Sequence, residues 1–358
     1  MNDMDAVEAI MRRGGDGLRE RMVRTELHLE RVTAEAGDPL ASHATATVLA
    51  GGKRLRPLLV VLAAESAGGP RSNGLEGSGE AGERTSGTDG SMSGGPQARL
   101  ADGDGEDSLV RAAVAVELVH SATLVHDDVI DGAQLRRGRP SVAAAAGRKL
   151  AVATGDLLFS RAFAELAAGG SADAVRILTR ASRELALGEL AQRADAWSAE
   201  VTVDRYLMRC RLKTAVLFRA ACELGALEAD TDPATLGGFG ERIGLAFQIL
   251  DDVLDVSGPP ERTGKPRGAD LLDGTVTLPL ILARSRDPEL AALDPRTVRT
   301  AADAAAVCDR IAATGALDTA KARAQELVSG AKQELPGLPA RQRAALELVA
   351  DVVVERYA

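Results

Sequence analysis

Two short segments carry three aspartates each, in the same spacing. They are Asp127, Asp128 and Asp131 in one segment, and Asp251, Asp252 and Asp255 in the other. Each group follows an apolar run, and on a helix the first and last aspartate lie about 40° apart on one face. Carboxylates this close repel each other unless a cation neutralises them. Mg²⁺ is usually held by one or two carboxylates together with substrate phosphate oxygens, so two such helices facing one cavity would hold a diphosphate through bridging metal ions. The alternative for a single group is a solvated helix end, but two groups embedded in apolar helices favour the metal site.

Positively charged residues lie beside glycine or threonine at four places. They are Lys53, Arg54 and Arg56 in the segment GGKRLRP, then Arg136 and Arg137, then Lys213 before Thr214, and Lys265. The spacing is not that of a Walker loop, and it suits a diphosphate held by side-chain charge. Any one of these places alone is more often a solvated surface. Together with the paired aspartates, they indicate two diphosphates, one bound through metal and one through cations.

His120 precedes Asp127 by seven residues, which places it about 20° away on a helical wheel. We therefore expect His120 to face the same cavity and to contact a phosphate; a core histidine with satisfied hydrogen bonds is the alternative. His126 points elsewhere on the wheel and is interpreted as structural.

The composition favours helices and excludes several functions. The chain has 358 residues and only five Phe, two Tyr and one Trp, which argues against base-stacking platforms and a β-sandwich core. The net charge of −9 indicates no nucleic-acid partner. Three cysteines without a CxxC pair indicate reduced thiols in the cytoplasm, and neither an export signal nor a transmembrane span is expected.

Apolar periodicity predicts an all-α fold. The expected helices cover residues 109–130, 150–168, 174–193, 203–224, 233–256 and 301–314. Thr202 and Asp232 are expected to begin helices, whereas Gly188, Gly225 and Gly315 are expected to end or kink them. Residues 68–107 contain twelve glycines and five serines, so we predict a disordered insertion within a single domain of residues 1–358.

Six segments in order resemble the trans-polyprenyl diphosphate synthases, in particular the long-chain bacterial type. They are GGKRLRP, ELVHSATLVHDDVIDGAQLRRGRPS, GDLLFSRAF, KTAVLF, GLAFQILDDVLD and GKPRGADLLDGTVTLP. The resemblance runs from Gly51 to Leu282 and implies an isoprenoid synthase-type helical bundle around a deep central cavity. It also implies a homodimer in the cytoplasm, in contact with the membrane at most peripherally when product is released.

The resemblance further implies a Mg²⁺-dependent prenyltransferase with about three ions per site, for which Mn²⁺ is a possible substitute. Isopentenyl diphosphate would lie on Lys53, Arg56, His120 and Arg137. The allylic diphosphate would bind metal held by Asp127, Asp131 and Asp251, to which the repeated spacing adds Asp255. Asp128, Asp252 and Lys213 are further catalytic candidates. The remaining implied contacts to the allylic diphosphate are Arg136, Thr214, Gln248 and Lys265.

The chain departs from that family where many members have Glu-Gly-Lys, because it has Asp273, Gly274 and Thr275. One lysine contact to the allylic diphosphate is therefore missing. Two alternatives to the synthase are a class I terpene cyclase, which would lack the second aspartate motif and the GGKRxRP segment, and a non-catalytic subunit of a heteromeric synthase, which would tend to lose the aspartates. Dependence on an added second subunit stays open.

Product length is expected to depend on the helix before Asp127. Val116, Val119 and Thr123 lie near the stripe of Asp127, and the resemblance adds Ala122. Short-chain relatives carry bulky aromatics at the positions of Ala122 or Thr123. Both are small here, so a product of C30 or longer is expected. A C20 product is the alternative, with a deeper floor at Phe159 or Phe163.

Overall fold

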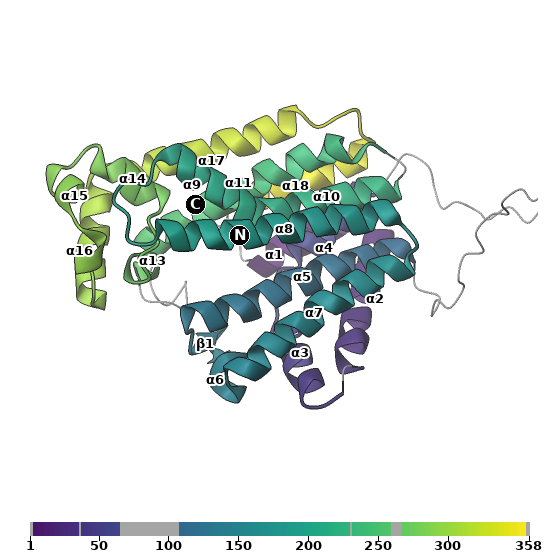
Figure 1. Ribbon diagram of the computed structural model, residues 1–358. Helices are drawn as coiled ribbons and strands as arrows, with labels where there is room; N and C mark the ends of the chain where they lie inside the picture. The colour runs from purple at the N-terminus through teal and green to yellow at the C-terminus, as the bar shows by residue number, and fades with distance from the viewer. Residues whose placement is uncertain (1–2, 36, 65–106, 230, 259–266, 356–358) are drawn as a thin grey trace, which may run out of the picture.

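The computed structural model describes residues 3–35, 37–64, 107–229, 231–258 and 267–355, and this part of the chain is almost entirely helical (Figure 1). The all-α prediction is therefore confirmed. The helices are α1 (Asp3–Gly14), α2 (Asp16–Ala34), α3 (Leu40–Val48), α4 (Leu55–Ala63), α5 (Ser108–Asp131), α6 (Val142–Ala146), α7 (Arg148–Ala168), α8 (Ala172–Asp195), α9 (Val203–Cys210), the π-turn η1 (Arg211–Ala215), α10 (Val216–Glu228), α11 (Pro233–Ser257), α13 (Ala269–Leu272), α14 (Leu278–Arg284), α15 (Pro288–Ala292), the 3-10 turn η2 (Pro295–Thr297), α16 (Ala301–Ala313), α17 (Ala316–Gln333) and α18 (Ala340–Glu355).

Helix α5 is the central element of the bundle. It packs against α4, α7 and α10, and every residue from Leu109 to Val119 is buried. The Asp107 carboxylate accepts a hydrogen bond from the Val110 backbone N–H at 2.8 Å and begins the helix, and Gly132, in the left-handed region at φ 65°, ends it. By length and composition α5 could cross a membrane, but 78% of its most apolar window is buried inside the protein, as in a core helix.

The predicted helix over residues 203–224 is interrupted in the structure. One turn of π-helix, Arg211–Ala215, which we call the π-turn, separates α9 from α10. Single turns of π-helix inside α-helices are frequent at functional sites. Gly188 lies inside α8 and faces this turn: a Cβ atom on Gly188 would lie 2.6 Å from the Lys213 backbone nitrogen. The expectation that Gly188 ends a helix is therefore wrong, and its small size instead allows close packing of α8 against this turn.

Gly225 has the same role inside α10, where a Cβ atom would lie 2.2 Å from the Val60 carbonyl oxygen of α4. Other boundaries follow the sequence. The Thr202 and Asp232 side chains cap the N-termini of α9 and α11, as predicted. Gly315, with φ 72°, separates α16 from α17.

A two-stranded hairpin, β1 (Leu135–Arg136) and β2 (Arg139–Pro140), follows α5 and is the one sheet among the described residues. It turns through Arg137, whose φ is 51°. The predicted insertion, apart from Asp107, lies outside the described residues, and its disorder stays a prediction.

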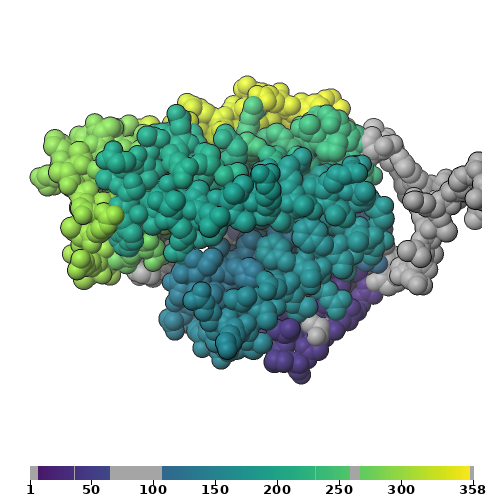
Figure 2. Space-filling view, viewed as in Figure 1, coloured from purple at the N-terminus to yellow at the C-terminus, as the bar shows by residue number. Residues whose placement is uncertain are grey.

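The helices form two layers. In Figure 1, α5 and α7 run below α8, while α11 and α17 lie above and behind. Figure 2 shows a narrow hollow on this face, between the layer of α5 to α7 and the layer of α8 and α9. One hydrophobic core includes residues from α1 to α18, consistent with a single domain.

Candidate active site

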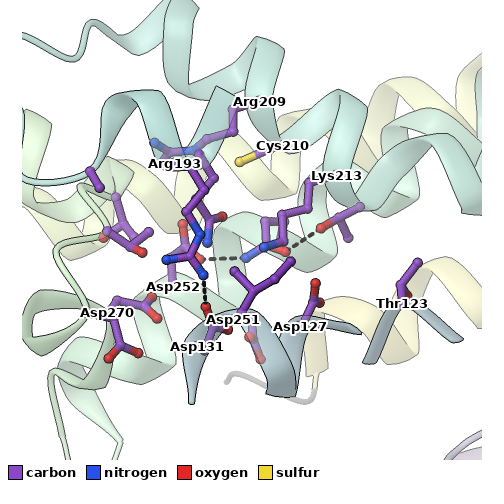
Figure 3. A pocket seen from close by; sticks show the side chains of 18 of the residues that line it. Thr123, Asp127, Asp131, Arg193, Arg209, Cys210, Lys213, Asp251, Asp252 and Asp270 are labelled. Atoms are coloured by element: carbon purple, nitrogen blue, oxygen red, sulfur yellow. Dashed lines mark hydrogen bonds and ion pairs between the residues drawn. The ribbon is translucent and has the colours of Figure 1, made fainter. Parts of the chain in front are cut away.

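A cavity of about 580 Å³ lies where α5 and α11 end, and both aspartate motifs contribute to its lining. Figure 3 shows the carboxylates of Asp127 and Asp131 from α5 near those of Asp251 and Asp252 from α11. Both motifs lie in the last turns of their helices, where the helix dipole disfavours negative charge by about 0.3–1 kcal/mol per group. Acidic groups gathered at two negative helix ends repel one another, and a bound cation would relieve this.

The three aspartates of the first motif have different surroundings. Asp127 lines the cavity, and burial raises the pKa of its carboxyl to about 6, although the charge of Lys213 opposes that shift. Asp131 is more exposed and forms an ion pair with Arg193 of α8. Asp128 is buried and accepts a hydrogen bond from Arg136 Nε at 2.9 Å. Asp128 therefore positions Arg136, a cavity-lining cation, and is not itself among the lining residues.

The second motif contributes two aspartates to the cavity lining, one exposed and one buried. Asp251 is exposed and lines it, as predicted from the spacing. Asp252 is only 3% exposed: it accepts hydrogen bonds from Tyr206 Oη at 2.6 Å and Gln248 Nε2 at 2.7 Å. Burial raises the pKa of the Asp252 carboxyl to about 7. Asp252 thus holds Tyr206 and Gln248 in place at the cavity wall.

Asp255 does not line the cavity, in contrast to the expectation that it pairs with Asp251. Its carboxylate instead accepts the backbone N–H of Asp270 at 3.3 Å, at the start of α13. The backbone at the start of α13 therefore lies beside the fifth position of the motif. We therefore leave Asp255 out of the metal site.

A second group of residues forms a positively charged wall. Arg56, in the first turn of α4, lies with its guanidinium 4.6 Å from the centre of the Phe218 ring. Burial and the nearby Arg137 lower the pKa of Arg56 to about 10, so it stays charged at neutral pH. Its buried Nε has no hydrogen-bond partner among the residues that the structure describes. Burial and the charges of Arg56 and Arg137 lower the pKa of His120 well below its usual value, so His120 is neutral.

Arg54 and Gly52 of the GGKRLRP segment have structural roles. Arg54 donates to the carboxylates of Glu26 and Glu117, each at 2.6 Å, and joins α2, α4 and α5. Gly52, at φ 152°, lies against Arg137: a Cβ atom there would be 3.2 Å from its guanidinium. Lys53 is half-buried in this loop and is not among the cavity-lining residues.

The π-turn brings Lys213 and Thr214 to the cavity, as the sequence predicts. Lys213 Nζ contacts Glu189 Oε2 of α8 at 2.5 Å. Thr214 Oγ1 donates to Gln248 Oε1 at 2.6 Å, which extends the hydrogen-bonded chain from Asp252. Lys265 lies outside the described residues.

A second cavity of about 370 Å³ adjoins the first between α5, α7 and α8. Its lining is largely apolar, and it shares four residues with the first cavity: Thr123, Asp127, Ile130 and Lys213. Phe159 of α7 forms part of its wall and stacks on His126 at 5.8 Å between ring centres. His126, interpreted as structural from sequence, therefore lines this cavity, and Gly155 makes room for its ring.

Of the four residues predicted to set the product length, one lines the cavities and three do not. Thr123 lines both cavities. Val116, Val119 and Ala122 are completely buried in the core and line neither of the two cavities. Phe163, the other deeper candidate, packs against the same core. The apolar space therefore begins at Thr123 and turns towards α7 and α8.

Sequence reasoning missed several lining residues: Gln192, Arg193, Trp197, Tyr206, Arg209 and Asp270. Glu189, Gln192 and Arg193 share one face of α8, a spacing that could have revealed them. Trp197, with φ 62°, lies against Gly274, so Gly274 is required by this close contact. Cys210 also lines the cavity, but burial raises the pKa of its thiol far above the usual value, which argues against a nucleophile.

The donor set fits Mg²⁺ bound together with a phosphate ligand. Asp127, Asp131 and Asp251 line one cavity and supply the hard oxygen donors that Mg²⁺ prefers. Within the described residues, no three His, Cys, Asp or Glu side chains are close enough to form a metal site by themselves. Such a site is completed by water and substrate oxygens, which is the usual case for Mg²⁺.

Comparison with known proteins identifies the family. The polyprenyl synthetase family model matches residues 38–313. The chain belongs to this family. The chain is therefore a trans-prenyltransferase. It is 36% identical over 335 residues to heptaprenyl diphosphate synthase component 2 of Geobacillus stearothermophilus, and the match covers 92% of this chain and 93% of that protein. The prediction of a trans-prenyltransferase with an isoprenoid synthase fold is confirmed.

Solved structures agree with this prenyltransferase fold. A polyprenyl synthase from Caulobacter crescentus, complexed with calcium and isoprenyl diphosphate, is 36% identical with a TM-score of 0.76, covering 95% of this chain and 98% of that one. A decaprenyl diphosphate synthase from Rhodobacter capsulatus is 29% identical with a TM-score of 0.79, and the match covers both chains completely.

Proposed function

We propose that this prenyltransferase extends an allylic diphosphate with isopentenyl diphosphate units to a long-chain trans-polyprenyl diphosphate. The observation that carries the proposal is the junction of the two cavities. A polar cavity with carboxylates and cations meets an apolar cavity at Thr123, Asp127, Ile130 and Lys213. A molecule with a diphosphate head and a hydrocarbon tail fits this arrangement, because each part finds its own chemistry.

We assign the allylic diphosphate to the aspartate side of the polar cavity. Asp127, Asp131 and Asp251 would hold Mg²⁺, with Mn²⁺ as a substitute. When bound, the metal neutralises the charge that develops on the leaving diphosphate. Lys213 and Arg136, which line the same cavity, add positive charge at that place without any proton transfer.

We assign isopentenyl diphosphate to Arg56 and His120, which line the cavity, and to Arg137, which is near both but is not among the lining residues. The unpartnered Nε of Arg56 supports this, because a buried donor without a partner is destabilising unless a ligand satisfies it. Neutral His120 can donate one N–H to a phosphate oxygen, while Arg56 and Arg137 supply charge. The two diphosphates would then face each other, which sets the isopentenyl double bond beside the allylic carbon.

Product length follows from the apolar cavity in this proposal. Thr123 leaves its entrance open, and the stacked pair of Phe159 and His126 forms part of its wall. Relatives named heptaprenyl and hexaprenyl synthases support a product of C30 or longer. A C20 product is the alternative, because Phe159 lies inside this cavity.

A single assay tests substrate and length together. The purified chain is incubated with Mg²⁺, labelled isopentenyl diphosphate, and geranyl, farnesyl or geranylgeranyl diphosphate in turn. We expect products of C30 or longer, shortened in Thr123→Phe and lengthened in Phe159→Ala. Leu166→Ala, which removes a buried residue of α7 outside both cavities, is the control for destabilisation alone. Unchanged product lengths in both cavity variants would refute the proposed path of the tail.

We further propose a subunit contact over α8, either with a second copy of the chain or with a different subunit. Leu190 of α8 lines the apolar cavity and is 66% exposed, and Leu187 beside it is 43% exposed. A partner covering these residues would close the cavity to water. The name "component 2" of the Geobacillus relative supports a heteromeric partner, and the family resemblance supports a homodimer. Light scattering and an activity assay on the chain purified alone distinguish the homodimer from the heteromeric complex. An active dimer supports the homodimer, and an inactive monomer supports a heteromeric partner.

A further inference from the structure

Arg193 forms an ion pair with a carboxylate that we assign to metal binding. It comes from the last turn of α8, and one guanidinium nitrogen contacts Asp131 Oδ1 at the end of α5. Figure 3 shows the Arg193 side chain extending to Asp131, with the contact marked. Asp131 is the fifth residue of the first motif. A protein cation thus lies where the proposed metal ion would bind.

The ion pair belongs to a chain of alternating charges across the cavity mouth. Arg193 Nε also contacts Glu189 Oε1, one turn earlier on α8, at 3.3 Å. The other oxygen of Glu189 contacts Lys213 Nζ at 2.5 Å. Glu189 therefore joins two cations, one next to Asp131 and the other near Asp127. Two cations, Arg193 and Lys213, thus lie among three carboxylates, those of Glu189, Asp127 and Asp131.

The Arg193 side chain is able to leave this position. It is 44% exposed, while Lys213 is 24% exposed and Glu189 is 17% exposed. Its backbone is firmly held, because Asp195, two residues later, is buried and paired with Arg205 and Arg209. A fixed helix end with a long, solvated side chain allows movement of the guanidinium without movement of α8.

A destination for the displaced guanidinium lies in the same cavity. Arg136 and Lys213, the two cations that we assign to the allylic diphosphate, line this cavity. Arg193 lines this cavity as well. Arginine forms bidentate, charge-assisted hydrogen bonds with phosphate oxygens, which a guanidinium released from Asp131 could make.

From these contacts we propose that Arg193 is an exchangeable counter-ion, which neutralises Asp131 before metal binds and contacts the allylic diphosphate afterwards. The inference rests on the proposed metal role of Asp131. Two positive charges compete for one carboxylate, so metal binding and the Arg193–Asp131 pair oppose each other. Arg193 therefore weakens binding of free metal and strengthens binding of diphosphate in the presence of metal.

The test measures two affinities of the full chain. Mn²⁺ binding without diphosphate is followed by the electron paramagnetic resonance signal of the free ion, and inorganic diphosphate binding at saturating Mg²⁺ is followed by calorimetry. Arg193→Leu is compared with the wild type, with Arg193→Lys, and with Arg176→Leu. Arg176 is the matched control, because it pairs with Asp173 on the exposed face of the same helix.

We expect opposite shifts in Arg193→Leu. Mn²⁺ binds about two- to fivefold more tightly, as loss of a partly exposed ion pair implies, and diphosphate binds about tenfold more weakly, as loss of a charged hydrogen bond implies. Arg193→Lys restores part of both values, and Arg176→Leu changes neither. A structural role for Arg193 would weaken both affinities or change neither, and either result overturns the inference. A wild type whose diphosphate affinity is the same with and without Mg²⁺ would instead refute the metal role of Asp131.

Discussion

The two aspartate motifs have identical spacing but different surroundings. In both, the first aspartate, Asp127 or Asp251, lines the cavity. The second, Asp128 or Asp252, is buried and accepts hydrogen bonds from other side chains. The fifth positions differ: Asp131 lies at the cavity beside Arg193, whereas Asp255 contacts the backbone at the start of α13. The motif repeats in sequence, but the site it builds is asymmetric.

The segment that follows each motif accounts for this difference. After α5 the chain turns at Gly132 into the hairpin. From the hairpin, Arg136 donates a hydrogen bond to Asp128. Beside the end of α11 lies the start of α13, where the Asp270 backbone N–H donates to the Asp255 carboxylate. Helical spacing therefore determines which carboxylates share a face, and the next segment decides which of them stays open.

The largest effects are expected at the first aspartate of each motif, where the two motifs are alike. Asp127→Ala and Asp251→Ala should each lower kcat/KM by about 10²–10³-fold, because each removes a charge that holds the leaving diphosphate through metal. Turnover is measured with thermal unfolding, which should show a retained fold. Near-normal turnover in either variant would remove that carboxylate from the site.

The fifth positions give the sharpest contrast. We expect Asp131→Ala to lower turnover by about 100-fold through loss of a metal ligand. Asp255→Ala should change it by less than about tenfold, because Asp255 does not line the cavity and its carboxylate accepts a backbone N–H. The Mg²⁺ concentration for half-maximal rate should rise only in Asp131→Ala. Equal losses in the two variants would contradict the asymmetry.

The middle positions should affect stability more than metal binding. Asp252→Ala leaves the buried Tyr206 hydroxyl and Gln248 amide without their acceptor, and we expect a loss of about 1–3 kcal/mol in the free energy of unfolding. Urea unfolding of this variant is compared with Asp251→Ala, which should unfold like the wild type. If both variants unfold alike, Asp252 does not hold the cavity wall.

Tyr206→Phe is the mildest change at this wall. It removes one hydroxyl that donates to Asp252 and keeps the buried ring, so a loss of about 1 kcal/mol is expected. Combined with Asp252→Ala, it should add little, since both changes remove the same hydrogen bond. Full additivity in urea unfolding would show that the two residues act independently.

Much of this protein could be predicted from local patterns. The caps at Thr202 and Asp232 and the periodic apolar residues specify helices through interactions within a few residues. The chemistry of the site was also readable, because Asp127, Asp251, Arg56, His120 and Lys213 all line one cavity as expected. These residue types have few structural reasons to occur together in apolar helices.

Features that depend on contacts between distant segments could not be predicted. The π-turn at Lys213 arises against Gly188, and Asp255 is covered by a segment that begins beyond its own helix. Val116 and Ala122 share a helix with Thr123 but are closed off by neighbouring helices.

The sequence by itself thus determined the helices, the paired carboxylates and the cations, since these depend on residue type and helical period. Only the tertiary structure decided which carboxylates stay open, where the apolar cavity runs, and that Arg193 reaches Asp131. Burial and partner choice are properties of the packed chain, because they depend on what other segments bring to each side chain.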